Sequence, residues 1–98
     1  MANRESTDMN DSLKTSVMEF PQDFPIKVMG EQHPEFTARV LQVVQQHAPN
    51  TQETDMRTRP SSKGNYISAT VLIRAESQEQ LDNIYRALSG HPLVKVVL

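Results

Sequence analysis

The stretch formed by residues 56–75 constrains the fold more than any other part of the chain. From Tyr66 to Ala75, large apolar and more polar side chains alternate, which is the period of a strand with one buried face. Residues 61–65 combine Ser, Lys, Gly and Asn, which favour a turn. The sequence therefore predicts two antiparallel strands joined by a polar turn. One face of the second strand is expected to carry Ile67, Ala69, Val71, Ile73 and Ala75, and the other Tyr66, Ser68, Thr70, Leu72 and Arg74.

The flanking segments supply further strand and helix signals. Residues 24–29 alternate as a strand, and apolar residues recur at helical spacing over residues 36–47, with Pro34 expected at the first helical position. Residues 93–98 are predicted to form a last strand. The first of these strands precedes a helix and the last follows one.

A second helix is predicted between the hairpin and the last strand. Ser77 and Gln80 have the spacing of a capping box, and Gly90 is expected at the C′ position that ends the helix. The element order is therefore β-α-β-β-α-β. With right-handed crossovers, this order gives an α+β, ferredoxin-like sandwich: a four-stranded antiparallel sheet with two helices on one face.

Composition excludes several kinds of chemistry. The absence of cysteine excludes disulfides, thiolate catalysis and cysteine-ligated metal sites. No apolar run reaches the length of about 20 residues that a membrane helix needs, and the N-terminus lacks a signal-peptide core. We therefore expect a cytoplasmic protein with no membrane association and no cofactor.

Charge divides the chain into two parts. Residues 1–19 carry a net charge of −2, whereas residues 20–98 hold eight basic and eight acidic residues. Residues 1–16 are polar and aperiodic, so we predict a disordered tail, followed by one domain over residues 17–98. The neutral domain has no overall attraction to nucleic acid, and Tyr66 alone offers an aromatic ring for base stacking. Nucleic acid is therefore not an expected partner.

The predicted topology gathers polar loop residues at one end of the sheet. A helix N-terminus and a lysine there favour a small ligand such as an amino acid or an anion, whereas Glu31 and Glu35 would repel an anion. The candidate ligand-binding residues are Gly30, His33, Lys63, Gly64 and Asn65. In the alternative interpretation, these residues only shape turns and start a helix.

Metal binding and catalysis are not expected. His33 and His91 each precede a proline, and no third ligand converges on them in the predicted fold. His33 is expected to cap its own helix, and His47 falls at the opposite end of the sheet. We predict that the protein is not an enzyme.

Three motifs resemble those of the YbeD-like family of small bacterial proteins. Phe24-Pro25 precedes Val28-Met29-Gly30, a Gln-x-His-Ala-Pro motif ends the first helix, and Pro-Ser-Ser-Lys-Gly-Asn-Tyr-x-Ser spans the hairpin. The resemblance covers roughly residues 17–98 and implies a ferredoxin-like fold similar to the ACT regulatory domain. It implies no catalytic residues. Glu35 occupies the position where ACT domains typically have a ligand-contacting glycine, which argues against amino-acid binding.

The open face of the sheet is the second candidate site. We expect it to expose Met29, Tyr66, Leu72, Leu93 and Val97, mixed with Lys27, Ser68, Thr70 and Lys95. Such a face is either covered by the N-terminal segment or binds a protein partner or a second copy. We predict a regulatory or adaptor domain that acts by protein contact, with Tyr66 and Leu72 as the partner-binding residues. The alternative is a small-ligand sensor of ACT type.

Overall fold

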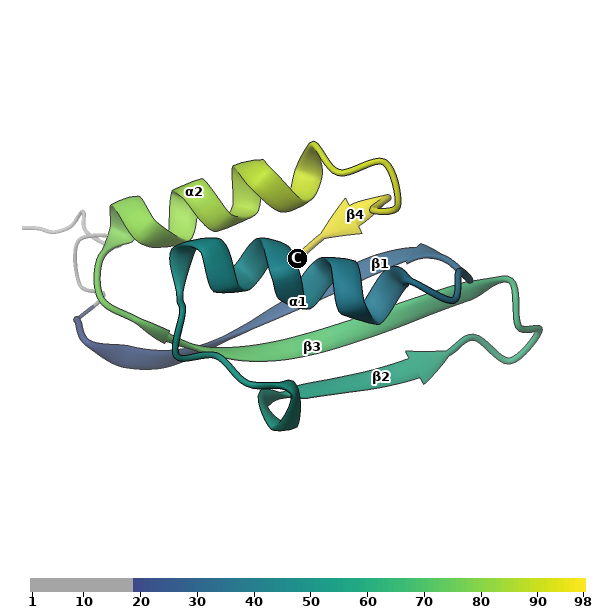
Figure 1. Cartoon of the computed structure of the whole chain (residues 1–98), viewed down its shortest axis with the longest axis horizontal. Helices are drawn as coiled ribbons and strands as arrows, with labels where there is room; N and C mark the ends of the chain where they lie inside the picture. The colour runs from purple at the N-terminus through teal and green to yellow at the C-terminus, as the bar shows by residue number, and fades with distance from the viewer. Residues whose placement is uncertain (1–18) are drawn as a thin grey trace, which may run out of the picture.

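The computed structural model describes residues 19–98, which form one sheet covered by two helices (Figure 1). The elements in chain order are β1 (Gln22–Glu31), α1 (Phe36–His47), the short 3-10 helix η2 (Glu53–Asp55), β2 (Met56–Pro60), β3 (Tyr66–Ala75), α2 (Gln78–Ser89) and β4 (Val96–Val97). The strand order is β2-β3-β1-β4, and every neighbouring pair is antiparallel. The predicted α+β ferredoxin-like fold is confirmed. The predicted tail, residues 1–16, lies outside the described residues.

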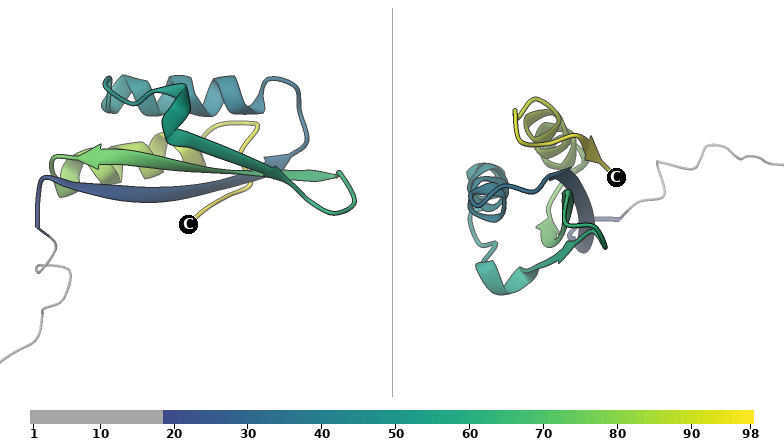
Figure 2. Two further views of the ribbon diagram at one scale, coloured as in Figure 1. Left: turned by 90° about the horizontal axis from the view of Figure 1, so that it is seen from below. Right: turned by 90° about the vertical axis from the view of Figure 1, so that its right-hand side faces the viewer.

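Both helices lie on one face of the sheet (Figure 2). We call this the inner face and the opposite one the outer face; no described helix covers the outer face. None of the helices formed by residues 19–98 is long and apolar enough to cross a membrane.

The central ladder joins β1 and β3 over their full length. Its ten pairs run from Gln22 opposite Ala75 to Glu31 opposite Tyr66. Because side chains alternate along each strand, Ile26 and Val28 share the inner face with Val71 and its neighbours at every second position. The buried core is made of Ile26, Val28, Phe36, Val40, Val44, Ala48, Ile67, Ala69, Val71, Ile73, Ala75, Leu81, Ile84 and Leu88.

The helices bury the apolar stripes that the sequence predicts. Helix α2 begins as expected, with the Ser77 hydroxyl accepting a hydrogen bond from the Gln80 N–H at 3.1 Å. The reciprocal bond of the capping box differs, because the Gln80 side chain accepts from the Glu76 N–H instead of that of Ser77. Helix α1 has no side-chain cap at Glu35, and Pro34 lies in the preceding turn, not at the first helical position.

The predicted hairpin turn is confirmed. Gly64 has a φ of 75°, the left-handed conformation that glycine adopts without strain. Its N–H donates to the Ser61 carbonyl at 2.9 Å, and the Ser61 N–H donates to the Tyr66 carbonyl at 2.8 Å. The closed turn extends beyond the helices (Figure 2).

The C-terminal strand differs from its prediction. Only Val96–Val97 form β4, and Val97 lies opposite Val28, which places it on the inner face. Leu93 also packs against the core from the loop before β4. The expectation that Leu93 and Val97 lie on the open face was therefore wrong, because the register of β4 reverses the assignment; Val96 and Leu98 are the exposed residues there.

Candidate functional site

The outer face of the sheet is left uncovered by the described helices (Figure 2). β1 presents alternate residues there, from Asp23 to Glu31, and β3 presents Tyr66, Ser68, Thr70, Leu72 and Arg74. β2 adds Arg57 and Arg59, which lie opposite Thr70 and Ser68. The alternate positions of β1 and β3 are buried, so the outer side chains of these two strands cannot turn into the core without a change of register. Strand β2 differs, because Thr58 and Pro60 on its other side are exposed as well.

Apolar exposure is concentrated on this face. The large hydrophobic residues that are exposed among residues 19–98 are Met29, Tyr66, Leu72, Val96 and Leu98. Strand pairing places all of them on the outer face: Val96 lies opposite Met29, and Leu98 exchanges backbone hydrogen bonds with Lys27. We call Met29, Val96 and Leu98 the apolar margin. Tyr66 and Leu72 lie toward the two ends of β3, on either side of Ser68 and Thr70.

The outer face also carries three cations, one on β1 beside the apolar margin and two on β2. Lys27, Arg57 and Arg59, which we call the basic strip, line an open hollow of about 630 Å³ together with Thr58, Ser68 and Thr70. The ion pairs among residues 19–98 join Arg39 to Glu35, Arg74 to Asp23 and Lys95 to Glu31, and none involves the basic strip. The three cations of the strip therefore form no ion pair within the described part of the chain.

The predicted ligand-binding residues have different local settings. Gly30 is buried on the inner face, where its Cα lies against the Leu93 carbonyl and the Phe36 ring. Asn65 uses its carbonyl to accept the Gln32 N–H at 3.0 Å, which ties the hairpin turn to the end of β1. Lys63 and Gly64 lie exposed in the turn.

His33 borders a different hollow from the one predicted. This hollow of about 100 Å³ is lined by Glu31, Gln32, His33, Pro92, Leu93 and Lys95, and it includes none of the turn residues. The Nδ1 atom of His33 accepts the Glu35 N–H at 3.0 Å, a bond within the turn that precedes Phe36, the first residue of α1. His91 does the same for the Leu93 N–H at 3.1 Å. These bonds give both histidines a structural role in their turns.

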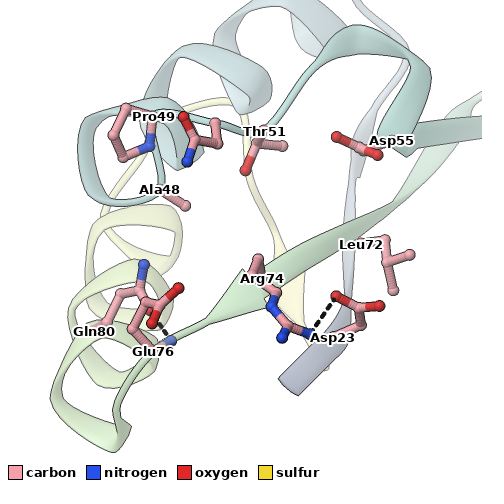
Figure 3. A pocket seen from close by; sticks show the side chains of 10 residues that line it. Asp23, Ala48, Pro49, Thr51, Asp55, Leu72, Arg74, Glu76 and Gln80 are labelled. Atoms are coloured by element: carbon pink, nitrogen blue, oxygen red, sulfur yellow. Dashed lines mark hydrogen bonds and ion pairs between the residues drawn. The ribbon is translucent and has the colours of Figure 1, made fainter. Parts of the chain in front are cut away.

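A second pocket, of about 250 Å³, lies at the end of the sheet where α1 ends and α2 begins (Figure 3). It is lined by Asp23, Ala48, Pro49, Asn50, Thr51, Asp55, Leu72, Arg74, Glu76 and Gln80, most of which sequence reasoning did not single out. The prediction missed them because the loop after α1 meets the ends of β1 and β3 only once the strand register is known.

The polar groups of this pocket are largely engaged with the protein itself. Arg74 pairs with Asp23 at 3.3 Å, and Asp55 accepts the Gln52 N–H at 2.8 Å. The Gln80 side chain donates to the His47 carbonyl at 2.9 Å. These bonds close the ends of neighbouring elements, so the pocket is better explained by structure than by ligand binding.

Burial raises the pKa of the Tyr85 phenol, whose hydroxyl donates to the Leu98 carbonyl at 3.3 Å. Tyr85 packs against the core on α2, away from the outer face. No group of three or more His, Asp or Glu side chains within residues 19–98 is placed to hold a metal ion.

The sequence prediction of the outer face omitted Arg57 and Arg59, as it omitted Val96 and Leu98. The signal was present, because arginines two apart in a strand share a face and the hairpin turn fixes their pairing with β3.

Comparison with known sequences assigns the chain to a family. Residues 15–98 match the model of a family described as "Protein of unknown function (DUF493)". The chain belongs to this family. A UPF0250 protein of Neisseria gonorrhoeae (strain ATCC 700825 / FA 1090) is 65% identical over 85 residues, which cover 87% of this chain and 93% of the relative. Another, from Paraburkholderia phytofirmans, is 56% identical over 87 residues, covering 89% and 98%. The resemblance to a family of small bacterial proteins is confirmed.

Solved structures share the fold at low sequence identity. Protein HP0495 from H. pylori matches with a TM-score of 0.68 and 14% identity over 90% of this chain and 91% of that one. The ACT domain from GTP pyrophosphokinase of Chlorobium tepidum matches with a TM-score of 0.59 and 17% identity, covering 78% and 84%. The DUF493 chain therefore has an ACT-like ferredoxin fold.

Proposed function

We propose that this DUF493 protein is a non-enzymatic regulatory or adaptor domain that binds a protein partner through the outer face of its sheet. One observation carries the proposal: every exposed large hydrophobic residue of the described chain lies on that face. Burying such side chains against a partner removes apolar area from water at about 25 cal/mol per Å². The helix layer offers no comparable surface within residues 19–98.

The exposed fractions of Tyr66 and Leu72 support their role as contact residues. Tyr66 is 53% exposed and Leu72 is 45% exposed, although both belong to a central strand. Tyrosine is enriched among residues that dominate binding energy in protein interfaces. A partner that spans the outer face along β3 would contact both side chains.

The test is co-purification of the intact protein with its partner from its own cells. The double variant Tyr66→Ala, Leu72→Ser should lose the partner, because truncating interface anchors typically costs about 2 kcal/mol or more each. The matched control, Gln42→Ala with Arg86→Ser, removes two exposed side chains from the helix layer and should keep it. Retention of the partner by the outer-face variant, or its loss in the control, would contradict the proposal.

The alternative of a small-ligand sensor has a separate readout. A ligand that binds only the folded protein raises its melting temperature, and the rise grows with the logarithm of the ligand concentration above Kd. A thermal-shift screen against metabolites should therefore leave an adaptor unchanged, whereas a sensor would be stabilised by its ligand.

A further inference from the structure

On the outer face, apolar residues lie at the β4 end of the sheet and arginines lie at the β2 end. One row of paired residues runs from Val96 on β4 through Met29 and Ser68 to Arg59 on β2. The neighbouring row runs from Leu98 through Lys27 and Thr70 to Arg57. Each row therefore begins at an apolar residue and ends at an arginine, with a small hydroxyl side chain before the arginine.

The cations of the basic strip are close enough to act together. Arg57 and Arg59 are two residues apart on one strand, and Lys27 lies two strands away from Arg57. Strand spacing makes these separations about 7 to 10 Å, within about one Debye length at physiological salt. The three charges repel one another, and a carboxylate placed between them would relieve that repulsion.

We infer that the partner presents an acidic segment whose aliphatic side chains cover the apolar margin and whose carboxylates meet the basic strip. This inference rests on the proposed function and specifies the chemistry of its partner. Arginine binds carboxylates through paired, charge-assisted hydrogen bonds, so Arg57 and Arg59 would fix the orientation of the segment. The segment needs its acidic residues only where it crosses β2, because the apolar margin lies at the β4 end of the same face.

Other occupants match the surface less well. Single-stranded nucleic acid needs aromatic rings for base stacking, and the apolar margin is aliphatic. Residues 1–18 of the chain carry three acidic and two basic residues, a net charge of −1 against the three cations of the strip. A second copy of the chain would bring another basic strip of the same sign.

To test this inference, peptides that bind the intact protein are selected from a phage library of random 12-residue peptides. Selected peptides are then measured by fluorescence anisotropy at low and physiological salt. The variant Arg57→Gln, Arg59→Gln removes two cations from the basic strip. The matched control, Arg39→Gln with Arg86→Gln, removes the same charge from the two helices, where Arg39 pairs with Glu35 and Arg86 bonds Asn83.

We expect the selected peptides to be rich in Asp, Glu and aliphatic residues. Their affinity should fall about tenfold or more in the strip variant, fall with salt, and stay unchanged in the control. A second variant, Met29→Gln with Val96→Thr, should also weaken binding, because it makes the apolar margin polar. Thermal unfolding of every variant establishes that the fold is intact.

Several outcomes would overturn the inference, and they differ from failure of the proposed function. Neutral or basic selected peptides that still lose affinity in Tyr66→Ala, Leu72→Ser would reject the acidic partner and leave the outer face as the binding surface. Binding of a poly-U oligonucleotide in place of acidic peptides would assign the strip to nucleic acid. An absence of selected peptides, with outer-face amide signals that shift in Glu5→Gln, Asp8→Asn, Asp11→Asn, would assign it to the N-terminal segment. If no peptide is selected and these amide signals do not shift, the acidic partner is rejected as well.

Discussion

The three glycines of the chain differ in how strictly their positions require glycine. The backbone of Gly30 does not require glycine, but there is no space for a side chain, because a Cβ atom there would meet the Leu93 carbonyl and the Phe36 ring. Gly64 has open space but a φ of 75°. Gly90 has neither constraint: it ends α2 with a φ of −86°, so it is not the left-handed C′ residue that the sequence suggested.

The glycine-to-alanine series should therefore separate these causes. Gly30→Ala should lower the free energy of unfolding by about 2 kcal/mol or more, because a backbone carbonyl cannot move aside as a flexible side chain can. Gly64→Ala should cost about 1 kcal/mol through the backbone conformation alone. Gly90→Ala should change stability by less than about 0.5 kcal/mol or raise it slightly. Urea unfolding at constant m-value measures all three, and a Gly30→Ala protein as stable as wild type would contradict the packing described around Gly30.

At the scale of elements, α2 depends on one hydroxyl for its start. The Ser77 side chain satisfies the Gln80 N–H, which would otherwise have no partner in the first turn. The helix then buries Leu81, Ile84 and Leu88 against the sheet. A weak start of α2 would therefore loosen one half of the helix layer.

Ser77→Ala should lower the free energy of unfolding by about 1 kcal/mol, the usual effect of removing an N-cap. Ser62→Ala, in the exposed hairpin turn, is the matched control and should stay within about 0.5 kcal/mol of wild type. Equal effects of the two changes, measured by thermal unfolding, would show that the hydroxyl of Ser77 does not cap the helix.

Helices and strands could be predicted from the sequence where their hydrophobic residues recur with a regular period. The register between paired strands could not be predicted in this way. The alternation in β3 and the stripe on α2 each extend over several turns or pleats, so residues such as Val71 and Ile84 could be assigned to the core. Val97 could not, because its face depends on which residue of β1 it pairs with. The ion pair between Asp23 and Arg74 could not be predicted for the same reason, because the two residues are 51 positions apart and meet only through strand pairing.

At the scale of the whole molecule, the sheet has a strong centre and weak edges. β3 is paired on both sides, with β1 and β2, whereas β4 contributes two residues to the sheet. The helices pack over β1 and β3, so the most buried hydrogen bonds lie in the central ladder. The edges are held by few bonds, among them those from Lys95 to Met29 and from Leu98 to Lys27.

Native-state hydrogen exchange should reproduce this gradient. The amides of Val71 and Ile73 should open only with global unfolding, whereas those of Lys95 and Leu98 should open with a free energy at least about 1 kcal/mol lower. Exchange as slow at Leu98 as at Val71 would mean that β4 unfolds together with the centre of the sheet.

The shortness of β4 also has a consequence for aggregation. β4 pairs with β1 at Val28 and Met29, so the first half of β1 has no neighbour on that side among the described strands. The unpaired N–H and C=O groups of a strand edge can form hydrogen bonds with a strand of another molecule. The backbone of Lys27 faces β4, so that of Pro25, two residues earlier, faces the unpaired edge, where proline offers no N–H. Asp23 adds a charge at the next such position. The proline and the carboxylate thus disfavour edge-to-edge pairing of β1 with a strand of another molecule.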